Sequence, residues 1–313
     1  MIRWLVVGAG QAGRCHMAAI ARAPNAMLAG LVDPKPANDL THLPCFVDLA
    51  SAIAAAKPNA VVIAAPNDTH VDLARAAIDA GLPVLCEKPV GRTAADAEAI
   101  AAYGVERGVP VGIVLNQRAL AATRWIKDLI ASGKLSPRSI SFTGDVTRLG
   151  SWHVDVARSG GGALRTIGIH YLDLLVWWLG KPLSFTANLM GEPAESAFKV
   201  TLQFTNGCVG SVEIAATREV GTGPVRCVIE SGEARATMEG HRIIEASGVP
   251  PTPEPEPLDP ALSYGPGHAT LTAEATASLN AGREFQIPLR AAIPTLRLVD
   301  SIYDQAGRAV PRI

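Results

Sequence analysis

The sequence has little of what marks membrane, secreted or nucleic-acid-binding proteins. Only 18% of its residues are charged and the formal net charge is −1, so no overall field would attract nucleic acid or an anionic membrane. No apolar run reaches the roughly 18 residues of a membrane-spanning helix, and no basic segment precedes the first apolar run, so we expect neither a span nor a secretory signal. The five cysteines are odd in number and contain no C-x-x-C pair. We therefore expect no disulfide framework, no bound metal and a reducing, cytoplasmic environment.

What the sequence does have is enough apolar material for two domains. With 313 residues, 48% of them hydrophobic, it suits a first domain over residues 1–118 and a second over residues 119–313. In the first, continuous apolar runs alternate with alanine-rich amphipathic stretches, which predicts an α/β domain with a doubly wound parallel sheet and helices on both faces. Strands are expected at 2–7, 27–32, 60–64, 83–86 and 109–115, and helices at 12–22, 49–57, 71–80 and 94–107.

The second domain has a different pattern, because its predicted strands alternate apolar and polar residues with a period of two. Asn206-Gly207 stands between two such runs, at 197–204 and 208–215, and indicates an antiparallel hairpin. We expect an α+β domain with a largely antiparallel open sheet and a few helices, the last of which is able to pack back on the first domain. Proline alternates with acids over 250–260, which predicts an exposed extended segment.

A glycine-rich turn, GAGQAG at residues 8–13, directly follows the first predicted strand. Its spacing suits a dinucleotide, because Gly8 permits the tight turn, Gly10 lets a pyrophosphate approach the backbone, and Gly13 lets the next helix pack closely on the sheet. Asp33 ends the second predicted strand 20 residues after Gly13, where a carboxylate accepts hydrogen bonds from the adenosine ribose. Since that charge repels a 2′-phosphate, NAD is the expected cofactor.

Further polar residues follow the predicted strands at 60–64 and 83–86, at the edge where a doubly wound sheet binds its ligands. A lysine at the position of Lys88 can donate a hydrogen bond to a substrate oxygen and stabilise negative charge on it. His70 either meets the cofactor or simply caps the following helix, and Lys35 near the predicted ribose-binding acid leaves NADP open. The residues expected to bind the cofactor are Gly8, Gly10, Gln11, Ala12, Gly13, Asp33, Ala65, Pro66, Asn67, His70, Glu87, Lys88 and Asn116.

Three consecutive glycines at 160–162 precede a predicted helix over 168–179. Thr166 and His170 are four residues apart, so they share one helix face if the helix begins that early. Asp173 lies three residues beyond His170, where its carboxylate could orient the imidazole. This combination predicts a polar site at the start of the helix.

Four segments together, GAGQAG at 8–13, APNDTH at 65–70, EKP at 87–89 and GGGALRTIGIHYLD at 160–173, resemble the glucose–fructose oxidoreductase, inositol dehydrogenase and rhizopine-catabolism (Gfo/Idh/MocA) family in their order and spacing. The resemblance implies a Rossmann domain and a second domain whose open sheet forms the interface of a homodimer or homotetramer. It also implies hydride transfer between a nicotinamide and a carbohydrate-like alcohol.

The same resemblance assigns catalysis to Lys88 and His170, and it places Thr166 where the family often has Asp or Asn. A threonine can hydrogen-bond a hydroxyl but cannot act as a base near neutral pH, so removal of the proton falls to His170. We expect an NAD-dependent dehydrogenase acting on a CH–OH group of a sugar, sugar nucleotide or cyclitol. A cofactor-binding sensor without turnover and a reductase of a non-carbohydrate substrate are the alternatives.

Two looser resemblances concern the substrate. Residues 151–155 and the segment from Tyr264 to His268 are similar to family members that oxidise nucleotide-linked amino sugar uronates. Arginine pairs with an anionic sugar and an aromatic ring stacks on it, although surface salt bridges are the alternative role for the arginines. The expected substrate-binding residues are Arg118, Trp152, Arg165, Thr166, His170 and Tyr264.

Overall fold

The computed structural model describes residues 1–40, 42–219, 221, 223–257, 259–262 and 265–308. The chain divides into two compact units, each made of two separate segments. The first unit contains Met1–Asn116 and Leu258–Ile293, and the second contains Gln117–Pro257 and Pro294–Ile313. The chain therefore leaves the first unit next to the expected boundary at 118, and it returns to that unit later.

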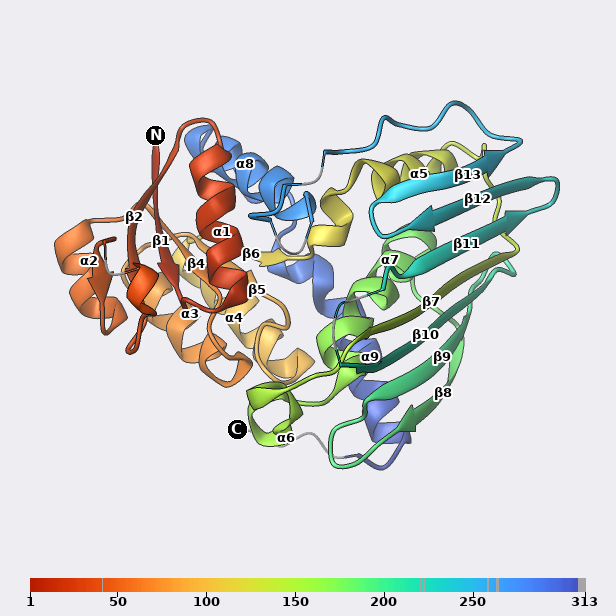
Figure 1. The fold of residues 1–313 in the computed structure, drawn as a ribbon, viewed down its shortest axis with the longest axis horizontal. Helices are drawn as coiled ribbons and strands as arrows, with labels where there is room; N and C mark the ends of the chain where they lie inside the picture. Colours follow the sequence, from red (N-terminus) through yellow and green to blue (C-terminus); the bar gives the residue numbers. More distant parts are fainter. Residues whose placement is uncertain (41, 220, 222, 258, 263–264, 309–313) are drawn as a thin grey trace. The chain divides into compact units, whose positions relative to one another are not determined.

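The first unit is built on a six-stranded parallel sheet (Figure 1) with the order β3-β2-β1-β4-β5-β6. Every pairing between its six strands is parallel, which confirms the doubly wound sheet that the continuous apolar runs predicted. Because β1 and β4 are neighbours and the chain winds outward from each, their carboxyl ends form the switch point at which such sheets bind ligands. The strands are β1 Ile2–Val7, β2 Ala26–Val32, β3 Cys45–Phe46, β4 Ala60–Ile63, β5 Val84–Glu87 and β6 Val111–Val114.

Among the described residues of the first unit, five α-helices accompany this sheet. Helix α1 packs on α8, and α3 packs on α4. The indole nitrogen of Trp4 in β1 donates a buried hydrogen bond of 3.0 Å to Thr276 Oγ1 in α8, which explains why this late helix belongs to the first unit. The helix that returns is therefore α8, whereas the last helix, α9, belongs to the second unit. The five are α1 Gln11–Arg22, α2 Leu49–Ala56, α3 His70–Asp79, α4 Ala94–Arg107 and α8 Gly267–Asn280.

The second unit contains a seven-stranded sheet in the order β13-β12-β11-β7-β10-β9-β8 (Figure 1). Its pairings are antiparallel except that of β7 with β10, which confirms the largely antiparallel sheet. The predicted hairpin around Asn206-Gly207 is the β9–β10 pair. The strands are β7 Ser139–Thr147, β8 Ser184–Met190, β9 Ala197–Gln203, β10 Val209–Arg218, β11 Arg226–Ser231, β12 Ala234–Glu239 and β13 Arg242–Ser247.

One face of this sheet forms the core of the second unit. Phe142, Phe198 and Val212 point to that face and are buried in one cluster with residues of α5 Ala121–Ala131, α7 Ile169–Leu179 and α9 Ile293–Gln305. The alternate positions, such as Lys199 and Glu213, are exposed on the other face. The period of two in the sequence thus produces a sheet covered by helices on one side and open on the other.

The proline-rich segment runs along α5 without forming a helix or strand over residues 251–257. The indole of Trp125 donates to the Pro251 carbonyl at 3.1 Å, and Glu256 Oε2 accepts the backbone N–H of Ala121 at 3.1 Å. The carboxylate therefore binds an N–H group at the first turn of α5, where the helix dipole favours negative charge.

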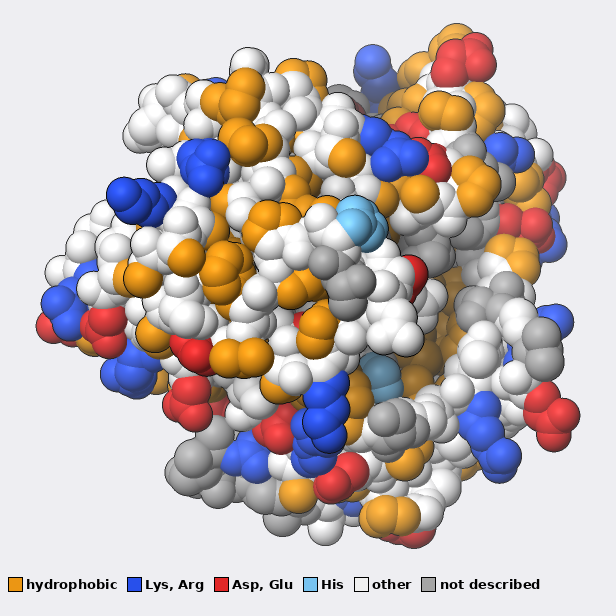
Figure 2. Space-filling model, turned by 60° about the vertical axis from the view of Figure 1, so that its left-hand side comes forward, with side chains coloured by type: hydrophobic (Ala, Val, Ile, Leu, Met, Phe, Trp, Pro, Cys, Tyr) orange, Lys and Arg blue, Asp and Glu red, His pale blue; other side chains and the backbone are white. Residues whose placement is uncertain are grey.

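Charged side chains of both signs are interspersed on the face that Figure 2 shows, with apolar side chains between them. This distribution agrees with the formal net charge of −1. Within the described part of the chain, none of the helices has the length and hydropathy that a bilayer crossing requires.

Candidate functional site

The glycine-rich loop between β1 and α1 has the shape that a dinucleotide needs. A Cβ atom at Gly13 would lie 1.9 Å from the Gly8 carbonyl oxygen, and one at Gly8, whose φ is +101°, would lie 2.4 Å from the Ala64 carbonyl oxygen. Around the Cβ position of Gly10, by contrast, the structure describes no heavy atom within 4 Å apart from the chain neighbours. Gly10 is also the N-cap of α1 and has no side chain to accept the first N–H groups. Those N–H groups and the positive dipole end suit a pyrophosphate.

Asp33 stands beside this loop at the end of β2. Its Oδ2 accepts the backbone N–H of Ala9 at 2.9 Å, and its Oδ1 accepts that of Lys35 at 2.8 Å. The two bonds fix the carboxylate next to the glycine loop, and each oxygen keeps a lone pair for a further donor. The arrangement fits the ribose hydroxyls of NAD, and its charge disfavours the 2′-phosphate of NADP.

His70 joins the loops that follow β4 and β5. Its Nδ1 lies 2.8 Å from the Pro89 carbonyl oxygen, and its Nε2 lies 2.8 Å from the Ala65 carbonyl oxygen. Burial lowers the pKa of His70, although the two carbonyl groups oppose that shift. Both ring nitrogens are thus engaged with the backbone of strand-end loops. Contact of Ala65, Pro66, Asn67 and His70 with the cofactor stays a prediction.

Lys88 directly follows β5, at the edge of the sheet where β1 and β2 also end. Its side chain is half-buried. Burial lowers the pKa of Lys88, and the charge of neighbouring Glu87 partly opposes the shift. An ammonium group that has lost part of its hydration makes a stronger hydrogen bond to a developing negative charge.

Two histidines meet Glu87 in the interior of the first unit. His16 Nε2, from α1, lies 2.9 Å from Glu87 Oε1, and His268 Nε2, from α8, lies 3.2 Å from the same oxygen. Asn116 Nδ2 lies 3.3 Å from His268 Nδ1. His16 was not predicted as a site residue, although its position three residues after Gly13 at the start of the first predicted helix was a usable signal.

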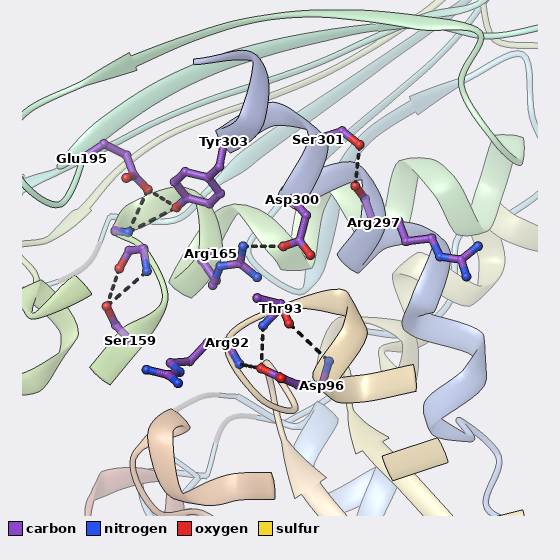
Figure 3. A network of polar contacts seen from close by, with 12 residues as sticks. Arg92, Thr93, Asp96, Ser159, Arg165, Glu195, Arg297, Asp300, Ser301 and Tyr303 are labelled. Atoms are coloured by element: carbon purple, nitrogen blue, oxygen red, sulfur yellow. Dashed lines mark hydrogen bonds and ion pairs between the residues drawn. The ribbon is translucent and has the colours of Figure 1, made fainter. Parts of the chain in front are cut away.

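In the second unit, the glycines at 160–162 are anchored by a buried carboxylate (Figure 3). Glu195 Oε1 accepts the Tyr303 hydroxyl at 2.6 Å and the backbone N–H of Gly162 at 3.0 Å. It also accepts the backbone N–H of Leu164 at 2.9 Å. A Cβ at Gly161 would lie 2.2 Å from that hydroxyl, and one at Gly162 would lie 2.2 Å from the Glu195 carbonyl oxygen. The glycines therefore let the chain pass between α9 and the β8–β9 turn.

A short π-helix, Leu164–Gly168, follows the glycines and continues into α7. The helical path thus begins early enough to carry both Thr166 and His170, which are half-buried. π-helical turns are rare and recur at functional sites. The sequence predicted a helix only from residue 168, because glycine and the β-branched Thr166 have low α-helix propensity.

Asp173 is engaged away from its predicted role beside His170. Its Oδ2 and Oδ1 accept Nε and Nη2 of Arg118, both at 2.7 Å, and Oδ1 also accepts the Thr295 hydroxyl at 3.0 Å. Arg118 also lies over the ring of Trp177, with its Cζ 5.4 Å from the centroid. These contacts connect the start of α5, α7 and α9. Binding of substrate by Arg118 stays a prediction, and two of its nitrogens are held by Asp173.

Arg165 and Trp152, which were also predicted to bind the substrate, each contact other residues of the second unit. Arg165 is buried on the π-helix, where its Nη2 donates to Asp300 Oδ1 at 2.6 Å and its guanidinium lies over the Tyr303 ring (Figure 3). The indole of Trp152 stacks on the His153 ring at a centroid distance of 3.9 Å. Tyr264 lies outside the described residues.

Comparison with known proteins covers both units. A model of an oxidoreductase family with an NAD-binding Rossmann fold matches residues 2–114, and a model of the GFO/IDH/MocA C-terminal domain matches residues 123–235. The rhizopine catabolism protein MocA of Rhizobium meliloti is 27% identical over 230 residues, which span 67% of this chain and 69% of that protein. Inositol 2-dehydrogenase of Rhizobium meliloti (strain 1021) is 30% identical over 192 residues, which span 59% of this chain and 58% of that protein.

The fold has close counterparts among solved structures. The WlbA dehydrogenase from Bordetella pertussis, in complex with NADH and UDP-GlcNAcA, matches with a TM-score of 0.84 and 24% identity over 98% of this chain and 95% of that one. At that level of identity the likeness concerns the fold alone. It extends over nearly the whole length of both chains.

Proposed function

This chain belongs to the Gfo/Idh/MocA family of oxidoreductases with an NAD-binding Rossmann domain, and from that premise we propose that it transfers hydride between NAD and a CH–OH carbon of a sugar, sugar nucleotide or cyclitol. The observation that carries the proposal is the position of Lys88. It follows β5 at the same edge of the sheet as the glycine loop after β1 and Asp33 after β2.

The residues of the first unit would hold the cofactor and one substrate oxygen. The N–H groups at the start of α1 bind the pyrophosphate and Asp33 accepts the ribose hydroxyls. When bound, NAD supplies the hydride acceptor or donor. Lys88 donates a hydrogen bond to the substrate oxygen and lowers the cost of its developing alkoxide character.

In the second unit, His170 removes the hydroxyl proton during oxidation and returns it during reduction. Thr166 offers a hydroxyl group on the same helical segment and cannot take the role of a base. This assignment leaves one general base, in contrast to family members with a carboxylate four residues before the histidine. The same feature keeps a sensor without turnover as the competing function.

The names of the relatives support a polyol substrate. One of them is named for oxidation of inositol, and the WlbA structure holds a nucleotide-linked sugar acid. We infer that the substrate presents adjacent hydroxyl groups, and that Trp152 and Tyr264 offer aromatic surfaces to it. Arg118 and Arg165 are paired with Asp173 and Asp300, so they would contribute only their remaining N–H groups as hydrogen-bond donors.

Two further features belong to the proposal. The open face of the second unit's sheet is the expected contact surface of a homodimer or homotetramer, with no role for nucleic acid or a membrane surface. All five cysteines are thiols in the structure, which suits a reducing cytoplasm.

The test is a screen of sugars, cyclitols and sugar nucleotides, read as the change in absorbance of the reduced nicotinamide with NAD⁺ and NADP⁺ in parallel. A substrate-dependent signal, larger with NAD⁺, supports the proposal. Tight NAD⁺ binding without turnover over the whole panel supports the sensor, and turnover restricted to imines or enones supports a reductase of non-carbohydrate substrates.

A further inference from the structure

The cluster of His16, Glu87 and His268 is buried in the first unit, next to the proposed reaction residues. The three residues are 0%, 8% and 3% exposed. Both imidazoles direct Nε2 at one oxygen, Glu87 Oε1, while Oε2 accepts the backbone N–H of Lys88 at 3.3 Å. The cluster thus joins α1, the end of β5 and the start of α8.

The positions of the protons follow from the contact with Asn116. The Nδ2 group of an amide can only donate, so the 3.3 Å contact makes His268 Nδ1 the acceptor and places the ring proton on Nε2. His16 also directs Nε2 at the carboxylate, and its Nδ1 is buried without a hydrogen-bond partner among the described residues. A carboxylate oxygen can only accept, so the 2.9 Å contact with Glu87 Oε1 places a proton on His16 Nε2.

Glu87 is therefore a buried anion that accepts three hydrogen bonds. Burial by itself raises the pKa of Glu87, but the bonds from His16 and His268 outweigh it and hold that pKa well below the ordinary value. The other titratable groups that interact with the charge of Glu87 are Lys88, Cys86 and His70.

The same three side chains also have the spacing of a metal site, because their nearest ligand atoms lie within 4.8 Å of one another. A cation would need a lone pair on Nε2 of each histidine. The bond from Asn116 leaves that lone pair on Nδ1 of His268 instead. The hydrogen-bond pattern therefore favours a cluster that carries protons rather than a cation.

We propose that His268 is a positioning residue, which holds the Glu87 anion together with His16 and so fixes Lys88 and Asn116 at the cofactor edge of the sheet. The assignment rests on the proposed function, since it takes Lys88 and Asn116 to meet NAD. His268 contacts the ends of both β5 and β6. Its Nε2 faces Glu87, the residue before Lys88, and its Nδ1 faces Asn116, which follows β6. Removing its side chain takes away the contact with Glu87 and the contact with Asn116 together.

The first test reads the tautomers without cofactor or substrate. In protein labelled with ¹⁵N-histidine, long-range ¹H–¹⁵N spectra should show a proton on Nε2 of both His16 and His268, and none on Nδ1 of His268. The two rings are assigned by single substitution among the seven histidines. A His268 ring protonated on Nδ1 overturns the proposal. So does a stoichiometric shift of both rings on addition of Zn²⁺, which would make the cluster a metal site.

The second test compares three variants by NAD⁺ binding. His268→Leu is expected to weaken binding about 10-fold to 100-fold, since a buried charge loses a hydrogen bond. Without the bond from His268, burial raises the pKa of Glu87 in this variant. Glu87 therefore takes up a proton more readily, and the loss of NAD⁺ affinity should grow as the pH falls towards 5. His268→Gln retains an N–H donor and should restore most of the affinity and the wild-type pH response.

Thr276→Val is the matched control, because Thr276 lies on α8 like His268 but has no contact with Glu87. The substitution removes the hydrogen bond that Thr276 accepts from Trp4 in β1. It should lower stability while NAD⁺ affinity stays at the wild-type level. An affinity loss in Thr276→Val equal to that of His268→Leu, or no loss in His268→Leu at any pH, overturns the proposal. These readouts need no turnover, so failure to find a substrate affects the proposed function and not this assignment.

Discussion

Arg118 and Asp173 form a bidentate ion pair inside the second unit, with both N···O distances at 2.7 Å. Their side chains are 8% and 1% exposed. The pair joins the turn before α5 to α7, and the bond from Thr295 adds α9 to the same carboxylate. A charged pair so far removed from water is costly to break, because either partner alone is left as an uncompensated buried charge.

Replacing Asp173 by Asn should therefore lower the free energy of unfolding by about 3–5 kcal/mol. The Arg118→Met, Asp173→Leu double variant should recover part of that loss, because no buried charge remains. Urea denaturation measures both changes. The control is Glu239→Gln, which breaks the half-exposed pair with Arg226 and should cost less than about 1 kcal/mol. An equal cost at the two sites would contradict the argument.

Substitution of the two proposed reaction residues should separate chemistry from cofactor binding. Lys88→Met and His170→Ala are each expected to lower kcat about 100-fold to 10,000-fold, the usual range for a positioned acid or base. The dissociation constant for NAD⁺ should change little. Lys134→Met, at an exposed position just after α5, provides the lysine control and should retain wild-type kcat. Wild-type turnover in either reaction variant would remove that residue from the mechanism.

The pH dependence of oxidation should carry the signature of Lys88. Since burial lowers the pKa of Lys88, its ammonium group loses its proton at a lower pH than that of an exposed lysine. The charged form donates the hydrogen bond to the alkoxide, so kcat/KM should fall as the pH rises through this pKa. In Lys88→Arg the charge persists, and the alkaline decrease should move to higher pH. If kcat/KM of Lys88→Arg falls at the same alkaline pH as that of the wild type, the decrease belongs to a group other than Lys88.

Two glycines of the nucleotide loop should respond differently to the same substitution. Gly10→Ala meets open space and ordinary backbone angles, so the free energy of unfolding should stay within about 0.5 kcal/mol. NAD⁺ affinity should nevertheless fall at least roughly 10-fold, because the methyl group occupies the approach of the pyrophosphate. Gly13→Ala should lower both stability, by about 1–3 kcal/mol, and affinity. Calorimetric unfolding and NAD⁺ titration measure the two quantities; unchanged affinity in Gly10→Ala contradicts the binding mode.

The elements with strong local signals were predicted nearly to the residue. β1 begins and ends at Ile2 and Val7, and α4 covers Ala94–Arg107 as expected. The first is a buried parallel strand with a continuous apolar run, and the second has reciprocal capping bonds between Thr93 and Asp96. The strand Cys45–Phe46 was not predicted, because two residues are too short to show any periodicity.

The site was predictable only where one segment carries the signal. The glycine loop and Asp33 belong to one strand–helix–strand unit, so their spacing is informative. Glu87 and His268 are 181 residues apart, and Arg118 and Asp173 are 55 apart. Such pairings depend on how the chain returns through the fold, and neither propensity nor periodicity contains that information.

The return of residues 258–293 to the first unit has a consequence for biosynthesis. Trp4 leaves the ribosome 272 residues before its partner Thr276 on α8, which follows only after β8 to β13 have been made. Domains are generally able to fold in the order in which they are translated. Here the first unit stays incomplete until α8 has been made, and the surface that α8 will cover is left open to chaperones in the meantime.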